Sequence, residues 1–106
     1  MIIYVDIDET ICYREEKDLD YANSLPILPN IEKINGLYDQ GHTIIYWTAR
    51  GTKTGINWFN LTLKQFTDWG VKFHELRMNK PFYDLFIDDR VLNTKDLLEL
   101  QFTQQT

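Results

Sequence analysis

Short apolar runs recur along the chain, and polar or turn-forming residues follow each of them. The run at 2–7 is almost entirely apolar and ends in an acid, which is typical of a strand buried on both faces of a sheet. Runs at 43–47 and 84–88 have the same character. A shorter, alternating run at 71–76 predicts one further strand.

Between these runs, apolar residues return every three or four positions, as on one face of a helix. The first such helix is expected to begin at Asn30, a favourable N-cap residue, and to end before Gly41. A second helix is expected over about 57–69, and a short third one over about 94–100. Strands that alternate with helices predict a Rossmann-like α/β fold with a mainly parallel sheet and flanking helices.

The composition fits one domain, 1–106, because 106 residues that are 43% apolar and 14% aromatic can form their own core. The net charge of −5 disfavours nucleic acid and anionic membranes as bulk partners. Cys12 is the only cysteine, the first residues do not resemble a signal peptide, and no apolar run is long enough to cross a membrane. These features predict a cytoplasmic protein without a membrane partner.

Polar residues gather where the predicted strands end. Ligands of parallel sheets bind at the carboxyl ends of the strands, so the side chains just beyond these ends are candidates for chemistry. We expect four carboxylates, one hydroxyl and two cations at this edge: Asp6, Asp8, Asp88, Asp89, Thr48, Arg50 and Lys80.

The two acids after the first strand are the most informative of these residues. Asp6 and Asp8 are two positions apart, so their carboxylates point the same way on an extended chain. Two like charges at close range are unfavourable unless a cation lies between them or one of them is protonated. An all-oxygen site of this kind suits Mg²⁺, and Asp88 and Asp89 supply further acid for it. The sequence therefore predicts a Mg²⁺ site beside groups that can hold phosphate.

Four segments resemble, in order, the motifs of the haloacid-dehalogenase-like (HAD) phosphatase superfamily. Residues 5–10 match its apolar strand followed by DxDxT, and residues 44–48 match its second apolar strand, which ends in Thr or Ser. Lys80 fits the third motif, and residues 85–89 fit the fourth, an apolar strand that ends in paired acids. Together the four motifs bracket most of the chain.

The resemblance implies a Mg²⁺-dependent phosphomonoester hydrolase. Asp6 would attack phosphorus and form an aspartyl-phosphate, and Asp8 would protonate the leaving oxygen and then activate water. Thr48 and Lys80 would hold the transferring phosphoryl group. Lys80 is preferred to Lys72 and Lys53 as the lysine of the third motif.

The resemblance also implies a ligand set for the metal. Mg²⁺ would be held by Asp6, by the backbone carbonyl of Asp8 and by one acid of the pair at 88–89, of which we favour Asp89 over Asp88.

Three further residues near the motifs are candidates for contact with the substrate. Thr10 and Arg50 are the candidate substrate-binding residues. Arg50 and Arg90 would either clamp a substrate phosphate or pair with a nearby acid, and the sequence leaves both roles open.

The intervals between the motifs leave no room for a cap domain. Only a short flap at about 11–25 and one helix fit between the first two motifs, and the interval after Thr48 holds little more than a helix and a strand. We therefore expect an open site, and the resemblance to small HAD phosphatases implies a small phosphorylated substrate, with a sugar phosphate and a nucleotide or nucleic-acid end both left open. A nucleic-acid end is less favoured by the net charge of −5. An open site also leaves room for a homodimer.

Other functions use similar residues. A receiver domain also combines clustered Asp, Thr and Lys on a small sheet, but there Thr and Lys follow the acids, whereas Thr48 and Lys80 precede the pair at 88–89. A phosphotransferase of the same fold would carry the same motifs. A metal- or phosphate-binding module without turnover is disfavoured because every motif residue is intact.

Overall fold

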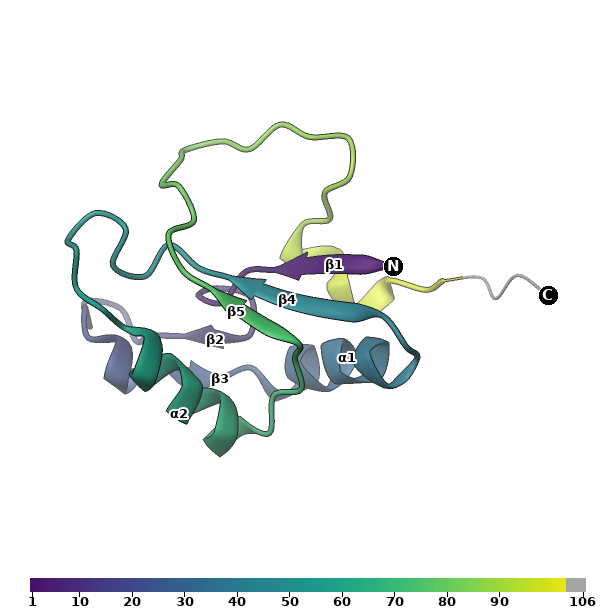
Figure 1. Ribbon diagram of the computed structural model, residues 1–106, viewed down its shortest axis with the longest axis horizontal. Coiled ribbons are helices and arrows are strands. Elements are labelled where there is room, and N and C mark those ends of the chain that lie inside the picture. The colour runs from purple at the N-terminus through teal and green to yellow at the C-terminus, as the bar shows by residue number, and fades with distance from the viewer. Residues whose placement is uncertain (103–106) are drawn as a thin grey trace.

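A parallel sheet lies at the centre of the computed structural model, which describes residues 1–102 (Figure 1). Its strands β1 (Ile2–Val5), β4 (Thr43–Trp47) and β5 (Glu75–Arg77) are all parallel and stand in the order β1-β4-β5. Parallel neighbours require crossover connections, which are provided here by helices α1 (Leu28–Asp39) and α2 (Phe59–Trp69). The predicted α/β fold with a parallel sheet is therefore confirmed.

Both α-helices lie on the same side of the sheet (Figure 1). Alternate residues of β4, Ile44 and Tyr46, are fully buried and face this side. Ile34 of α1 and Phe66 of α2 belong to the same core cluster, and the ring centroids of Tyr46 and Phe66 lie 4.9 Å apart. On the opposite face, Tyr4 of β1 is 49% exposed. The core thus lies between one face of the sheet and the two helices.

The helix boundaries depart from expectation by one or two residues for reasons visible in the contacts. Helix α1 begins at Leu28 with a proline in its first turn, because the side chain of Asn30 does not cap it but donates to the carbonyl of Thr10 at 2.7 Å. Helix α2 begins two residues later than predicted, and Asn57 accepts a hydrogen bond from its first backbone N–H. Gly70 ends α2 in the left-handed conformation at φ 69°.

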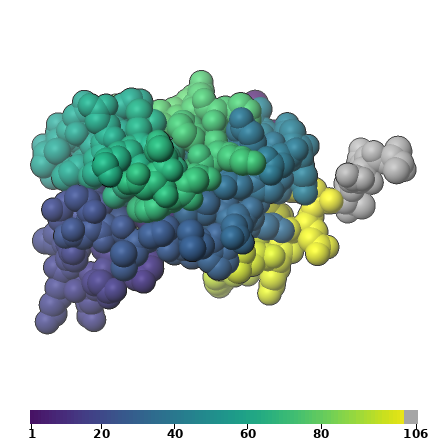
Figure 2. Space-filling model, turned by 90° about the horizontal axis from the view of Figure 1, so that it is seen from below, coloured from purple at the N-terminus to yellow at the C-terminus, as the bar shows by residue number. Residues whose placement is uncertain are grey.

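A short hairpin leads from β1 to α1 and forms the flap, residues 12–26. It consists of β2 (Cys12–Tyr13), the 3-10 helix η1 (Tyr21–Asn23) and β3 (Leu25–Pro26), and its two strands pair antiparallel. In Figure 2 the flap, purple to blue, forms a protruding corner of the molecule.

The third predicted helix is a 3-10 helix, η2 (Thr94–Glu99), that packs beside α1. Its Leu97 is buried, and the ammonium group of Lys33 on α1 donates to the carbonyl of Leu100 just beyond it. The polar tail that follows includes residues 103–106, which lie outside the described part of the chain.

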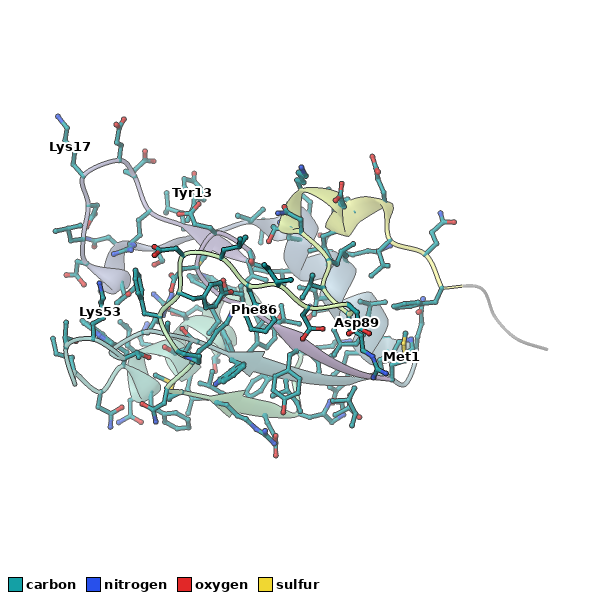
Figure 3. The ribbon with its side chains drawn as sticks, turned by 90° about the horizontal axis from the view of Figure 1, so that it is seen from above. Met1, Tyr13, Lys17, Lys53, Phe86 and Asp89 are labelled. Carbon is teal, nitrogen blue, oxygen red and sulfur yellow. The ribbon has the colours of Figure 1, made fainter. Side chains whose placement is uncertain are left out.

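The predicted strand at 84–88 is not formed, and this prediction was wrong. Residues 81–93 follow an irregular path across the open face of the sheet (Figures 1 and 3), where Leu85 and Ile87 are 75% and 88% exposed. An apolar run becomes a strand only where a neighbouring strand takes up its backbone hydrogen bonds. Within residues 1–102, no strand pairs with the outer edge of β1. The strand predicted at 71–76 does form, but only over Glu75–Arg77.

No helix within the described range 1–102 is long and apolar enough to cross a membrane.

The hydroxyl of Tyr46 generates a prediction about stability. It is buried without a hydrogen-bond partner among the described residues, and burial raises its pKa. An unsatisfied buried hydroxyl costs about 1–3 kcal/mol, so Tyr46→Phe should raise the free energy of unfolding, by about 1 kcal/mol, as measured by urea denaturation. Phe66→Leu, which replaces the neighbouring buried ring by a smaller aliphatic side chain, should lower the free energy of unfolding. A clear loss of stability in Tyr46→Phe would show that the hydroxyl is bonded after all.

Candidate active site

Five of the seven polar residues predicted at the carboxyl edge of the sheet lie together there. Nζ of Lys80 is 3.7 Å from Oδ1 of Asp6. The backbone N–H of Lys80 donates to the carbonyl of Thr48 at 2.9 Å. Nη2 of Arg50 is 3.0 Å from Oδ1 of Asp8. The end of β1 thus supplies two acids, the end of β4 supplies Thr48 and Arg50, and the segment after β5 supplies Lys80.

Asp6 is the most accessible acid of this group. Its side chain is 43% exposed, and that of Asp8 is 26% exposed. Burial of the remainder raises the pKa of Asp6 above its usual value, and the positive charge of Lys80 and the backbone N–H of Ile7 oppose this only in part. Asp6 is therefore a carboxylate with one cation beside it and an open approach from solvent.

The backbone on both sides of the lysine holds Lys80 in place. Besides the bond from its N–H to Thr48, its carbonyl accepts a 2.8 Å hydrogen bond from the hydroxyl of Thr52. The preceding residue, Asn79, adopts a left-handed conformation with φ 64°. The segment after β5 is thus tied to the loop after β4, which directs the ammonium group towards Asp6.

Thr48 is almost fully buried, at 1% exposure. Its Oγ1 accepts a hydrogen bond from the backbone N–H of Arg50 at 3.1 Å, so its own O–H remains available as a donor. The chain then turns at Gly51, where φ is 82° and a Cβ atom would lie 2.0 Å from the carbonyl oxygen of Ile56. Only glycine fits this turn, which redirects the chain immediately after Arg50.

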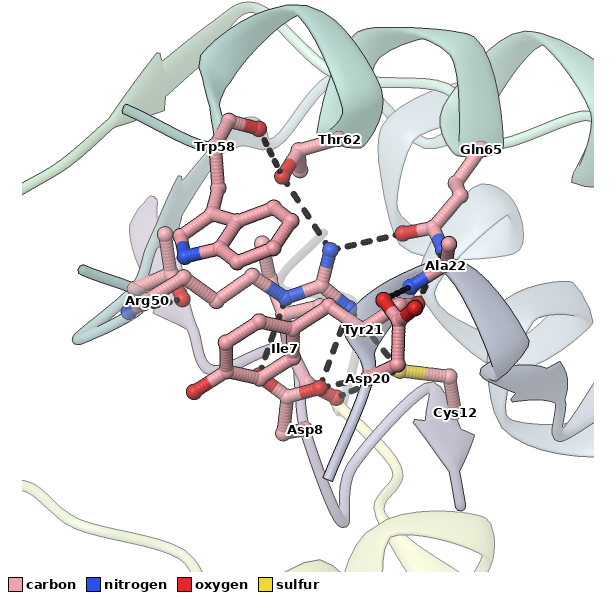
Figure 4. A network of polar contacts seen from close by, with 11 residues as sticks. Ile7, Asp8, Cys12, Asp20, Tyr21, Ala22, Arg50, Trp58, Thr62 and Gln65 are labelled. Atoms are coloured by element: carbon pink, nitrogen blue, oxygen red, sulfur yellow. Dashed lines mark hydrogen bonds and ion pairs between the residues drawn. The ribbon is translucent and has the colours of Figure 1, made fainter. Parts of the chain in front are cut away.

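Arg50 points into the protein, and its side chain is 0% exposed (Figure 4). Nε and Nη2 each donate at 3.0 Å to one carboxylate oxygen of Asp8, and Nη1 donates to Thr62 at 3.1 Å and to Gln65 at 2.6 Å. Nη2 also lies 3.6 Å from the sulfur of Cys12. A guanidinium has five N–H donors, and five acceptors surround this one. Of the two roles open from the sequence, the geometry favours pairing with an acid over clamping a phosphate.

Two of these acceptors, Thr62 and Gln65, were not identified from sequence. Both are buried on α2, three residues apart and therefore on one helix face. The sequence does contain a hint of this role. Thr62 and Gln65 are polar, yet they lie next to Phe66 on the side of the helix that faces the core, where apolar residues are the rule.

Cys12 and Thr10 also have defined partners. The thiol of Cys12 lies 3.5 Å from Oδ1 of Asp8, and burial, followed by the negative charge of Asp8, raises its pKa to about 12. The hydroxyl of Thr10 is 2.9 Å from that of Thr94, which links the turn after β1 to η2. Thr10 as a substrate-binding residue stays a prediction.

Asp88 and Asp89 are not brought to the other acids. Both are exposed, and Oδ1 of Asp88 accepts a hydrogen bond from the backbone N–H of Arg90 within the loop. Figure 3 shows Asp89 towards the end of the molecule where Met1 lies, which is the amino end of β1. Among residues 1–102, no three His, Cys, Asp or Glu side chains come together as a metal-binding group. The predicted metal ligands are therefore assembled only at Asp6 and Asp8.

The raised pKa of Cys12 leads to a chemical prediction. Because the thiolate is the reactive form, alkylation of the native protein by iodoacetamide at pH 8 should be about a thousandfold slower than that of an exposed thiol. The rate should rise about tenfold for each pH unit. Cys12→Ser/Glu16→Cys, with an exposed thiol in the same flap, is the matched control and should react at once. Rapid labelling of native Cys12, followed by mass spectrometry, would contradict the buried arrangement.

Comparison with known proteins bears on the fold. No model of a protein family matches the chain, and no curated protein matches it. Among solved structures, the chain is similar to a structural-genomics target from Vibrio cholerae, with a TM-score of 0.84 and 24% sequence identity. The match covers 94% of this chain and 89% of that one. At this identity the likeness shows that the chain shares its α/β fold with this bacterial protein.

Proposed function

We propose that the chain is a capless HAD-type phosphatase that hydrolyses phosphomonoesters through an aspartyl-phosphate on Asp6. The observation that carries this proposal is the grouping of Asp6, Asp8, Thr48 and Lys80 at one edge of the sheet. A nucleophilic carboxylate must be reachable, and Asp6 is 43% exposed with Nζ of Lys80 only 3.7 Å away.

The residues divide the reaction into two steps. In the first, a carboxylate oxygen of Asp6 bonds to phosphorus as the bond to the leaving oxygen breaks, and Asp8 gives its proton to that oxygen. In the second, Asp8 takes a proton from water, which attacks the aspartyl-phosphate and releases inorganic phosphate. Lys80 and the hydroxyl of Thr48 stabilise the charge on the phosphoryl oxygens in both steps.

Mg²⁺ is the metal that we assign to this site. The carboxylate of Asp6 and the backbone carbonyl of Asp8 are hard oxygen donors, and Mg²⁺ completes its coordination with water and substrate phosphate. When bound, it would offset negative charge on the phosphoryl group. Asp88 and Asp89 do not form a metal-binding group with Asp6 and Asp8 among the described residues. The proposal that one of them binds Mg²⁺ therefore rests on the sequence alone.

The substrate that we propose is a small phosphorylated molecule, such as a sugar phosphate or a nucleotide. The net charge of −5 disfavours a nucleic-acid end. A hollow of about 380 Å³ lies beside the loop after β4, but none of the four proposed catalytic residues lines it. Its lining is neutral except for the arginine: Arg50, Gly51, Gly55, Ile56, Asn57, Phe59, Met78 and Asn79.

The proposal predicts that Asp6→Asn abolishes turnover without unfolding the protein, because an amide is not a nucleophile. Phosphate release should be measured for sugar phosphates, nucleotides and 3′- or 5′-phosphorylated oligonucleotides, with and without Mg²⁺. We expect Mg²⁺-dependent release that falls at least about a thousandfold in the variant. Asp68→Asn, which removes an exposed acid of α2, is the matched control. Equal activity of Asp6→Asn and the control would rule out the mechanism, and transfer to an alcohol in place of water would indicate a phosphotransferase.

Asp8→Asn should depend on the leaving group in a way that Asp6→Asn does not. Alkyl phosphates need a proton on the leaving oxygen, so their turnover should fall by about 10²–10⁴. The first step with p-nitrophenyl phosphate should be much less affected, because p-nitrophenolate leaves without a proton. The phosphoenzyme should then accumulate and be visible by intact mass spectrometry after an acid quench. Equal losses in the first step, measured as release of the leaving group in a single turnover of each substrate, would argue against Asp8 as the proton donor.

A further inference from the structure

We propose that Arg50 is a positioning residue, which holds the carboxylate of Asp8 in the orientation from which it transfers protons. The inference rests on the proposed function, since it gives Asp8 its part in the reaction. It begins with the two parallel hydrogen bonds of 3.0 Å that join Nε and Nη2 of Arg50 to Oδ2 and Oδ1 of Asp8. A bidentate pair fixes the plane of a carboxylate, which a single contact does not.

The exposure of the two partners shows which side of Asp8 is held. The side chain of Arg50 is 0% exposed, whereas that of Asp8 is 26% exposed. The guanidinium is therefore on the buried side of the carboxylate, and the rest of the Asp8 side chain is open to solvent. Oδ1 of Asp8 also accepts from the thiol of Cys12, so Oδ2, which accepts only from Nε of Arg50 among the described residues, is the oxygen with a second lone pair for the leaving oxygen or for water.

The arginine is itself fixed by two elements outside the site (Figure 4). Thr62 and Gln65 of α2 accept from Nη1, and their own donors bond to backbone carbonyls, that of Trp58 at 2.8 Å and that of Tyr21 at 2.7 Å. The ring of Tyr21 lies 4.8 Å from the guanidinium carbon. Helix α2 and the flap thus determine where Arg50 can lie, and Arg50 determines how Asp8 is turned.

Stability gives little reason for such a pair. Taking a guanidinium and a carboxylate out of water costs about as much as their attraction returns, and apolar replacements of similar volume are often equally stable. A phosphate clamp is disfavoured too, because all five donors of Arg50 are engaged within the protein. Orientation of Asp8 is the function that this arrangement serves.

The test is a double-mutant cycle of Arg50→Lys and Asp8→Asn in the full chain. Lysine keeps the charge but cannot span both oxygens of Asp8. We expect Arg50→Lys to slow the first step, measured as release of the leaving group in a single turnover, about 10–100-fold for an alkyl phosphate and several-fold less for p-nitrophenyl phosphate. KM and the inhibition constant of inorganic phosphate should change less than twofold. In the Asp8→Asn background, Arg50→Lys should cost less than twofold, because the residue it orients is already gone.

Three results would overturn the inference while the proposed function stands. An inhibition constant for phosphate raised tenfold would make Arg50 a phosphate ligand. An undiminished loss in the Asp8→Asn background would make its role structural. Full activity of Arg50→Lys would show that Asp8 needs no positioning. If wild type releases no phosphate from any substrate, the proposed function fails and the inference fails with it.

Two further variants separate positioning from folding. Gln65→Met removes one bond that holds Arg50 and leaves the pair with Asp8 intact, so it should give the same leaving-group dependence with a smaller loss. It replaces Arg50→Lys in the cycle if that variant does not fold. Arg77→Lys, at the end of β5, alters a half-exposed arginine paired with Glu75 and should leave all rates unchanged.

Discussion

The buried ion pair between Arg50 and Asp8 is the constraint on which the rest of the candidate site depends. A guanidinium removed from water is tolerated only where its donors find acceptors, and here these acceptors come from the turn after β1, from α2 and from the sulfur of Cys12. Asp6 lies two residues from one partner of the pair and Thr48 two residues from the other. The buried contact thus joins the two chain segments that carry Asp6 and Thr48, just beyond the point where β1 pairs with β4.

The sequence was sufficient for the features that depend on local periodicity. Continuous apolar runs identified β1 and β4, and helical spacing identified α1 and α2, because burial imposes these periods on any chain. Because ligands gather at the carboxyl ends of parallel strands, the sequence alone predicted that Asp6, Thr48 and Lys80 lie at one edge of the sheet. The contacts of Lys80 with the other two show that this reasoning was correct.

The features that the sequence did not provide all depend on partners far along the chain. The apolar run at 84–88 has the composition of a strand, but composition does not bring it into pairing with the outer edge of β1, which no strand joins within residues 1–102. Asn30 is a good N-cap residue in isolation, yet its amide bonds to Thr10. Likewise, nothing local indicates that Thr62 and Gln65 accept from an arginine twelve or more residues earlier. Such choices are decided by tertiary contacts.

Within residues 1–102, the outer edge of β1 has no pairing strand and the side chains of Leu85 and Ile87 are exposed, which has a consequence for the molecule in concentrated solution. A free strand edge presents backbone donors and acceptors to any other extended chain, and natural proteins usually protect such edges with charge or proline. Here a tyrosine, Tyr4, and apolar loop residues stand nearby instead. The net charge of −5 gives rise to mutual repulsion that opposes such association, and salt weakens this repulsion. Colloidal stability at high ionic strength is thus set by this face of the protein and not by the packing of its core.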